Sequence, residues 1–132
     1  MPAAQIYVDG CDVCLDPCTA HNVRANLVAV DGLTYLLPPG DTRSLGPAPV
    51  LDGRECLALP AGSDRVLAEL HRLVRHGRTP GQAIAQALPG AGRIAEGTPA
   101  DWWLVPGGPL ADPSALRRPR HIVKGGVRVG GD

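Results

Sequence analysis

Short apolar runs separated by turn residues dominate the first half of the chain. These runs occupy residues 5–8, 12–15, 26–30, 33–37, 50–51 and 55–59. Asp-Gly pairs follow three of them, at Asp9-Gly10, Asp31-Gly32 and Asp52-Gly53. Asp-Gly between apolar runs is a strong turn signal, and Asp31-Gly32 suits the type I′ turn of a hairpin. The pattern therefore predicts an antiparallel β meander over residues 5–59.

After residue 62 the hydrophobic pattern takes the period of a helix. One helical face collects the apolar residues Val66, Leu67, Leu70, Leu73 and Val74. Ser63 or Asp64 can cap the start of this helix, and Gly77 stands where helices commonly end. The sequence Thr79-Pro80-Gly81-Gln82 has the residues of a capping box with proline at the first helical position. We therefore expect a helix pair near residues 64–88, ending at Pro89.

Strand patterns return in the last third of the chain. Residues 100–105 form one apolar run, and residues 121–124 and 127–129 flank a Gly-Gly turn. The chain of 132 residues is long enough for one hydrophobic core. The expected fold class is therefore mainly β with two helices (α+β), in a single domain over residues 1–132.

The core must be built almost without aromatic residues. Phe is absent, and the aromatic residues are Tyr7, Tyr35, Trp102 and Trp103. Adjacent strand residues point to opposite faces, so one of Trp102 and Trp103 fills the core and the other faces the helices, a partner or water. An exposed Trp would suit an interface anchor, and the competing interpretation is that the helices over 63–88 and the Pro-rich loop cover both side chains. The candidate interface residues are Trp102, Trp103, Leu70, Leu73 and Val74.

Charge and hydropathy give no sign of a polyanionic or membrane partner. The formal net charge is zero, and the basic run Arg117-Arg118-Pro119-Arg120 is too short for a nucleic-acid footprint. His71, Arg72 and Arg75 are interpreted as the solvated side of the first helix. The first eight residues lack the features of a signal peptide, and no segment reaches membrane-spanning length. We expect a cytoplasmic protein with reduced cysteines and no nucleic-acid or membrane partner.

A glycine-containing turn leads into the apolar strand near the C-terminus. It reads Gly92-Arg93-Ile94-Ala95-Glu96-Gly97-Thr98-Pro99-Ala100-Asp101, and a hairpin around Lys124-Gly125-Gly126 follows it. Residues 26–32, 49–60 and 70–83 add an Asp-Gly hairpin, a strand ending in Leu-Pro and a Thr-Pro helix pair. In this order the segments resemble the two ends of metal-dependent amidohydrolases. The resemblance implies a small β-sandwich, the composite domain of that superfamily, with strands from 1–60 and 92–132 and helices in 63–89.

The resemblance also implies a large gap after Pro60. In the family, this strand runs into a (β/α)₈ barrel of roughly 250 residues, whose first strand carries a His-x-His metal motif. Here Leu59-Pro60 leads through Ala61-Gly62-Ser63-Asp64 directly to the first helix. A second segment of the family is shortened near residues 87–92. The metal-binding histidines and the catalytic Asp of the family would all lie in the missing barrel, so we expect no catalytic residue in this chain.

Three functions remain open from these patterns. The first is a non-catalytic composite domain that acts by packing, either in a homo-oligomer or by docking a separate barrel-bearing chain. The second is a subunit or fragment of a metal-dependent hydrolase of non-peptide carbon–nitrogen bonds, with catalysis supplied outside this chain. Both functions require no cofactor in the chain itself.

The third function is a small zinc-binding module built from a cysteine cluster. Cys11, Cys14 and Cys18, with His21 nearby, could supply soft ligands for a tetrahedral zinc site. Two observations oppose it: a structural zinc site normally needs two spaced pairs, and a strand over 12–15 sends Cys11 and Cys14 to opposite faces. Packing of the cysteines as small apolar residues is the competing interpretation.

Overall fold

The fold is mainly β with two α-helices, as the sequence predicted. A computed structural model describes residues 3–63 and 65–131. The strands in this part of the chain are β1 (Ile6–Asp16), β2 (His21–Val30), β3 (Leu33–Leu37), β4 (Val50–Asp52), β5 (Cys56–Pro60), β6 (Trp102–Pro106), β7 (His121–Lys124) and β8 (Val127–Gly130). The helices are α1 (Val66–Arg75) and α2 (Pro80–Ala87), with the short 3₁₀ turns η1 (Pro89–Gly92) and η2 (Pro113–Arg117).

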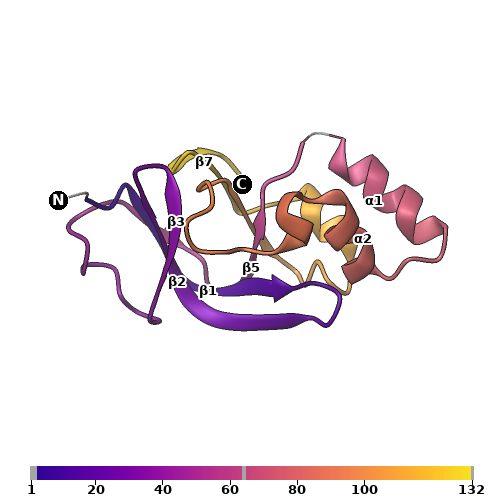
Figure 1. Cartoon of the computed structure of the whole chain (residues 1–132), viewed down its shortest axis with the longest axis horizontal. Helices are drawn as coiled ribbons and strands as arrows, with labels where there is room; N and C mark the ends of the chain where they lie inside the picture. Colours follow the sequence, from indigo (N-terminus) through magenta and orange to yellow (C-terminus); the bar gives the residue numbers. More distant parts are fainter. Residues whose placement is uncertain (1–2, 64, 132) are drawn as a thin grey trace.

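Both ends of the chain contribute to one eight-stranded sheet. Its order is β3-β2-β1-β5-β6-β7-β8, and β4 pairs with the first part of β1. The N-terminal strand β5 pairs in antiparallel register with the C-terminal strand β6, from Cys56 opposite Pro106 to Pro60 opposite Trp102. In Figure 1 the sheet fills the left and centre of the molecule, and the two helices form its right-hand end.

The sheet folds back on itself, so that β3 meets the segment before β6. The amide of Thr34 donates to the carbonyl of Thr98 at 2.7 Å, and the amide of Ala100 donates to the carbonyl of Gly32 at 2.8 Å. The folded sheet encloses one apolar core. This core is formed by Ile6, Val8, Cys11, Val13, Ala25, Leu27, Ala29, Cys56, Ala58, Ile94, Ala100, Trp102, Leu104 and Val123. Residues from both ends of the chain therefore share one interior.

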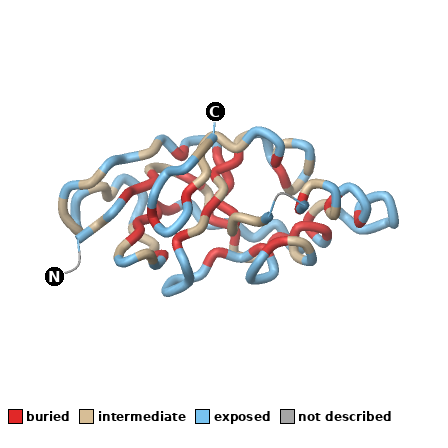
Figure 2. Tube along the Cα trace, turned by 90° about the horizontal axis from the view of Figure 1, so that it is seen from above, coloured by how far each residue is buried: buried red, intermediate tan, exposed pale blue. Residues whose placement is uncertain are grey.

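A second apolar cluster lies between the outer face of β5–β6 and the helices. The two residue sets alternate along β5, because successive side chains of a strand point to opposite faces. The second cluster contains Cys14, Leu57, Leu59, Val66, Leu70, Leu73, Ala83, Ile84, Leu88, Val105 and Leu116. Figure 2 shows the buried residues concentrated along the strands and on the inner side of the helices.

The predicted turn at Asp9-Gly10 is wrong: β1 is one continuous strand that carries a β-bulge there. Its pairing register with β2 shifts between Val8 and Cys11, and Gly10 has φ +76°. A positive φ is favourable for glycine and gives the bulge its bend. The Asp-Gly pair is therefore used to twist a long strand rather than to end it.

The predicted meander is correct only for β1, β2 and β3. Asp31-Gly32 forms the expected hairpin turn, with positive φ at both residues. Beyond that hairpin the antiparallel prediction fails, because β4 and β5 both run parallel to β1. The loop between β3 and β4 carries the chain back across the sheet. It covers Tyr7, whose hydroxyl donates to the carbonyl of Gly46 at 2.6 Å.

The helix pair forms as predicted, and its predicted caps can be compared with the structure at all positions but one. Thr79 and Gln82 form the capping box of α2 in both directions. Gly77 follows the C-cap of α1, and Ser63 accepts the amide of Val66 through its carbonyl rather than through its side chain. The other predicted cap, Asp64, lies outside the described residues. In the described part of the chain, no helix is long and apolar enough to cross a membrane.

Candidate functional site

A mostly apolar cleft lies where β5 leaves the sheet and where α2 ends. Its volume is about 200 Å³. The cleft is lined by Pro60, Ala61, Pro89, Gly90, Arg93, Ile94, Thr98, Pro99 and Asp101. One wall is formed by the end of β5 with the residues that precede β6, and the other wall is formed by the turn that follows α2. The cleft is therefore the surface at which these two segments of the fold meet.

Local backbone structure brings the two segments together. The amide of Ala61 donates to the carbonyl of Asp101 at 3.0 Å, which holds the end of β5 beside the start of β6. On the other wall, α2 stops before Pro89 and the chain turns through left-handed backbone. Gly90, Ala91 and Gly92 have φ of 60°, 57° and 74°. Such a run is costly for Ala91, since side-chain-bearing residues disfavour this region.

Two of the polar side chains around the cleft, Asp101 and Thr98, are hydrogen-bonded within the protein. Asp101 accepts the amide of Gly125 through Oδ1 at 2.8 Å. The Thr98 hydroxyl donates to the carbonyl of Ala95 at 2.6 Å. Arg93 forms a longer ion pair with Asp16, at 3.8 Å. The cleft thus offers apolar contact area rather than free catalytic groups.

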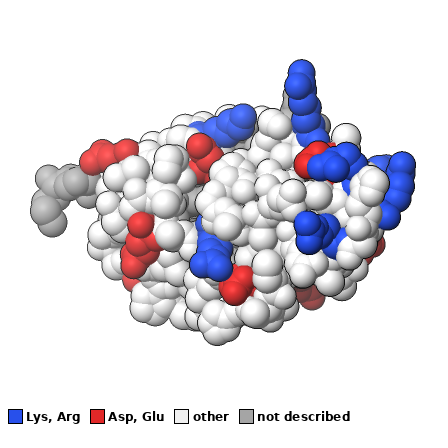
Figure 3. All heavy atoms as spheres, turned by 45° about the vertical axis from the view of Figure 1, so that its right-hand side comes forward, with Lys and Arg blue, Asp and Glu red and all other residues white. Residues whose placement is uncertain are grey.

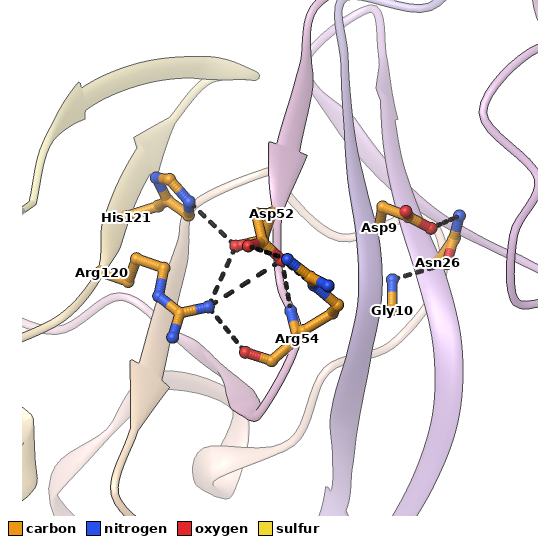
Figure 4. Close-up of polar contacts among 7 residues, drawn as sticks. All are labelled: Asp9, Gly10, Asn26, Asp52, Arg54, Arg120 and His121. Carbon is orange, nitrogen blue, oxygen red and sulfur yellow. Dashed lines mark hydrogen bonds and ion pairs between the residues drawn. The ribbon is translucent and has the colours of Figure 1, made fainter.

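A separate polar cluster joins the end of β4 to β7. Figure 4 shows Asp52 between Arg54 and Arg120, with His121 beside them. Asp52 accepts from the Nε of Arg54 at 3.1 Å, and Arg120 donates to the carbonyl of Arg54 at 2.6 Å. The hydrogen bonds from Arg54 lower the pKa of Asp52 to about 2. The cluster ties the N-terminal and C-terminal halves of the sheet together at the surface.

His121 is held as a neutral imidazole by its neighbours. Its Nδ1 accepts from the Nε of Arg128 at 2.9 Å, since a guanidinium can only donate. Its Nε2 therefore carries the proton and donates to the carbonyl of Asp52 at 3.1 Å. Burial lowers the pKa of His121, and the nearby guanidinium groups of Arg128 and Arg120 act in the same direction.

Asn26 holds the bulge of β1 from the neighbouring strand (Figure 4). It is fully buried, and its Oδ1 accepts from the amide of Gly10 at 2.9 Å. Its Nδ2 donates to Asp9 at 3.0 Å and to the carbonyl of Asp41 at 2.9 Å. Because all of these bonds fix backbone shape, we assign Asn26 a structural role.

The predicted zinc ligands are separated in the structure. Cys11 lies in the inner core, where burial raises its pKa to about 12, and Cys14 lies in the cluster beneath the helices, where burial raises its pKa to about 11. Cys18 and His21 are exposed at the β1–β2 turn. Within residues 3–63 and 65–131, no three Cys, His, Asp or Glu side chains are grouped to hold a metal ion.

The predicted interface residues divide into buried and exposed sets. Trp102 is fully buried in the inner core and donates through Nε1 to the hydroxyl of Thr34 at 2.9 Å. Leu70 and Leu73 are buried on the side of α1 that packs against the sheet. Trp103 is half-buried on the helix side of β6, and Val74 is exposed. Only Trp103 and Val74 therefore present surface to a partner.

Sequence reasoning marked Pro60 as the end of a strand and Pro89 as the end of a helix, but it did not identify the residues that line the cleft. Arg93, Thr98 and Pro99 sit in a segment without hydrophobic period, so no pattern marks them as neighbours of Ala61. The turn residues at Pro60 and Pro89 were the only local signal. Comparison of the sequence with models of known protein families gives no match, and comparison with curated proteins gives none either.

Proposed function

We propose that this chain is a non-catalytic packing domain, similar to the composite domain of amidohydrolases, that docks a separate barrel-bearing chain. One observation carries the proposal: the two ends of the chain form a single sheet around one shared core. In the resembled family, such a core is what remains when the catalytic barrel is removed. A domain with a complete core of its own can fold without the barrel.

The cleft supports a docking role for the same region. Pro60 and Ala61 end the strand from which the family barrel continues, and Pro89 and Gly90 mark the second shortened segment. Asp101 and Thr98 have hydrogen-bond partners within the protein, so a partner chain that covers the cleft needs to pair only the charge of Arg93, whose side chain is 55% exposed. A mostly apolar concave surface with one arginine at its edge suits a protein contact.

The metal chemistry of the resembled family does not fit the residues of this chain. No group of three potential metal ligands exists among the described residues. Cys11 and Cys14 lie on opposite faces of β1, which opposes the zinc module. We therefore place any hydrolysis of carbon–nitrogen bonds in the partner chain and derive no catalytic step here.

The proposal is tested by light scattering after size-exclusion chromatography. The purified chain is mixed with an amidohydrolase barrel that lacks its own composite domain. We expect a complex that Ala61→Arg weakens, because a long charged side chain would occupy the apolar cleft. The matched control is Ala3→Arg, which places the same side chain on an exposed residue that does not line the cleft.

Three outcomes would count against the proposal. A purified chain that binds one zinc and hydrolyses amides by itself would overturn it. Failure to form a complex with the barrel-only chain would reject the docking role. A stable homodimer that Ala61→Arg dissociates would replace docking with self-association at the same cleft.

A further inference from the structure

Although the formal net charge of this chain is zero, acidic residues predominate in its first half and basic residues in its second half. Residues 1–62 contain seven acidic and three basic residues. Residues 65–131 contain ten basic and four acidic residues. Figure 3 shows Lys and Arg gathered on the right, which is the helical end of the molecule. The helical end is therefore a basic surface on a neutral protein.

Two basic segments far apart in sequence meet at this end. The 3₁₀ turn η2 packs against α1 through Leu116, which is buried with Leu70 and Leu73. This packing places Arg117 beside α1, with its guanidinium 2.9 Å from the Nε2 of His71. The basic run 117–120 is too short for a binding surface by itself. Together with the basic residues of α1, it forms one larger basic surface.

We define the α1–η2 face by the residues that surround this contact. They are His71, Val74, Arg75, Arg78, Arg117 and Arg118, and all six are exposed. Arg72 is neutralised by Glu69, at 2.6 Å. By contrast, the side chains of Arg75, Arg78 and Arg118 form no hydrogen bond or ion pair with another described residue. Their charge is available to an external partner.

We propose that the α1–η2 face binds an acidic polypeptide segment that carries an apolar side chain between its carboxylates. Arginine binds carboxylates through two parallel hydrogen bonds, and it is enriched at protein interfaces where lysine is depleted. Every basic residue of this chain except Lys124 is an arginine. Val74, 37% exposed, gives the apolar contact among the charges.

The same face is poorly suited to nucleic acid. Binding of single strands uses aromatic side chains on which bases stack. None of the six residues of this face is Tyr or Trp, because Tyr7 and Trp102 are buried and Tyr35 and Trp103 are half-buried on strands β3 and β6. The ten residues of α1 span only about 15 Å, which is short for a phosphate track. The proposal is independent of the docking role of the cleft, because the two surfaces share no residue.

Fluorescence anisotropy with a labelled acidic peptide tests the proposal. The probe contains Glu and Asp around one central Leu, and the full chain is titrated at low and at high salt. We expect saturable binding that weakens with salt, and about tenfold weaker binding for the double substitution Arg75→Glu/Arg118→Glu. The matched control is Arg43→Glu/Lys124→Glu, which reverses two exposed charges elsewhere and leaves affinity within about twofold.

Circular dichroism shows whether each variant keeps the fold. If Arg75→Glu/Arg118→Glu unfolds the chain, the milder double substitution Arg78→Gln/Arg117→Gln replaces it in the titration. Equal affinity of the charge-reversed variant and the native chain would overturn the proposal. So would the absence of saturable binding, or tighter binding of a single-stranded oligonucleotide with the same net charge. Failure of this test leaves complex formation at the cleft unaffected, so the two proposals fail separately.

Discussion

The folded sheet and the helical end bury their apolar residues against different kinds of neighbour. In the sheet, strands from both ends of the chain are joined by backbone hydrogen bonds, and buried polar groups such as Asn26 and Thr34 have partners. The helical end packs on the outer face of β5–β6 through apolar side chains, and Gly81 of α2 lies against the carbonyl of Pro17 in the β1–β2 turn. It also presents exposed Val74 and arginines whose side chains bond to no other described residue. The folded sheet is thus the self-sufficient part, and the helical end is the part open to partners.

Trp102→Ala should have the largest effect, because it empties the centre of the core enclosed by the folded sheet. We expect a loss of about 3–5 kcal/mol in the free energy of unfolding, measured by urea denaturation. Trp103→Ala is the matched control on the next residue. Since Trp103 is only half-buried, its loss should be about 1–2 kcal/mol. Equal losses in the free energy of unfolding for Trp102→Ala and Trp103→Ala would contradict the separation of the inner core from the cluster beneath the helices.

Gly81→Ala tests how α2 is attached to the folded sheet. A Cβ at this position would overlap the carbonyl of Pro17 in the β1–β2 turn. We expect a loss of about 1–3 kcal/mol although alanine favours helices, because the helix must shift away from the turn. Thermal unfolding followed by circular dichroism measures it, with Gln86→Ala on the exposed side of α2 as control. A stabilised Gly81→Ala variant would show that α2 does not rest on Pro17.

Thr79→Ala removes one half of the capping box of α2. The hydroxyl of Thr79 accepts the amide of Gln82 at 3.1 Å, so its loss leaves a helix amide without its partner. The expected cost is about 1 kcal/mol, read from the urea midpoint. Thr79→Ser keeps the acceptor and should retain most of the stability. If Thr79→Ala leaves the urea midpoint of the native chain unchanged, the cap contributes nothing to the stability of the helical end.

The smallest expected effect is a pH dependence of stability from His121, at the start of β7 in the folded sheet. Burial lowers the pKa of His121 below its ordinary 6.5, so the folded state favours the neutral ring. The stabilisation is present above pH 6.5 and is lost as the pH falls below it, because the unfolded chain binds the proton first. Urea midpoints should fall between about pH 7.5 and pH 5.5. His121→Gln should flatten this change, whereas the exposed His76→Gln control should keep it.

Local features of this fold could be predicted from the sequence. The capping box at Thr79, the hairpin turn at Asp31-Gly32 and the separation of Trp102 from Trp103 depend on residues close together in the chain. The turn predicted at Asp9-Gly10 failed because the same dipeptide also suits a bulge. The choice is made by Asn26 on the neighbouring strand, which no local pattern can show.

The site could not be predicted fully, because its residues are brought together by contacts between segments far apart in the sequence. The parallel pairing of β4 and β5 with β1 depends on the loop that covers Tyr7, and this loop has no hydrophobic period. The cleft arises because Ala61 and Asp101 share a hydrogen bond across the sheet. Likewise, Arg117 reaches α1 only through the buried contact of Leu116. Each of these neighbours is chosen by tertiary packing rather than by spacing in the chain.

Hydrogen–deuterium exchange read by mass spectrometry tests most directly whether both ends of the chain form one cooperative core. Peptides from β1, β5 and β6 should be protected to the same extent, since their amides bond to one another across the shared sheet. Peptides from α1 and α2 should exchange faster. Exchange of β6 and β7 well before β1 and β2 would contradict the account, because it would show that the C-terminal strands fold apart from the N-terminal ones.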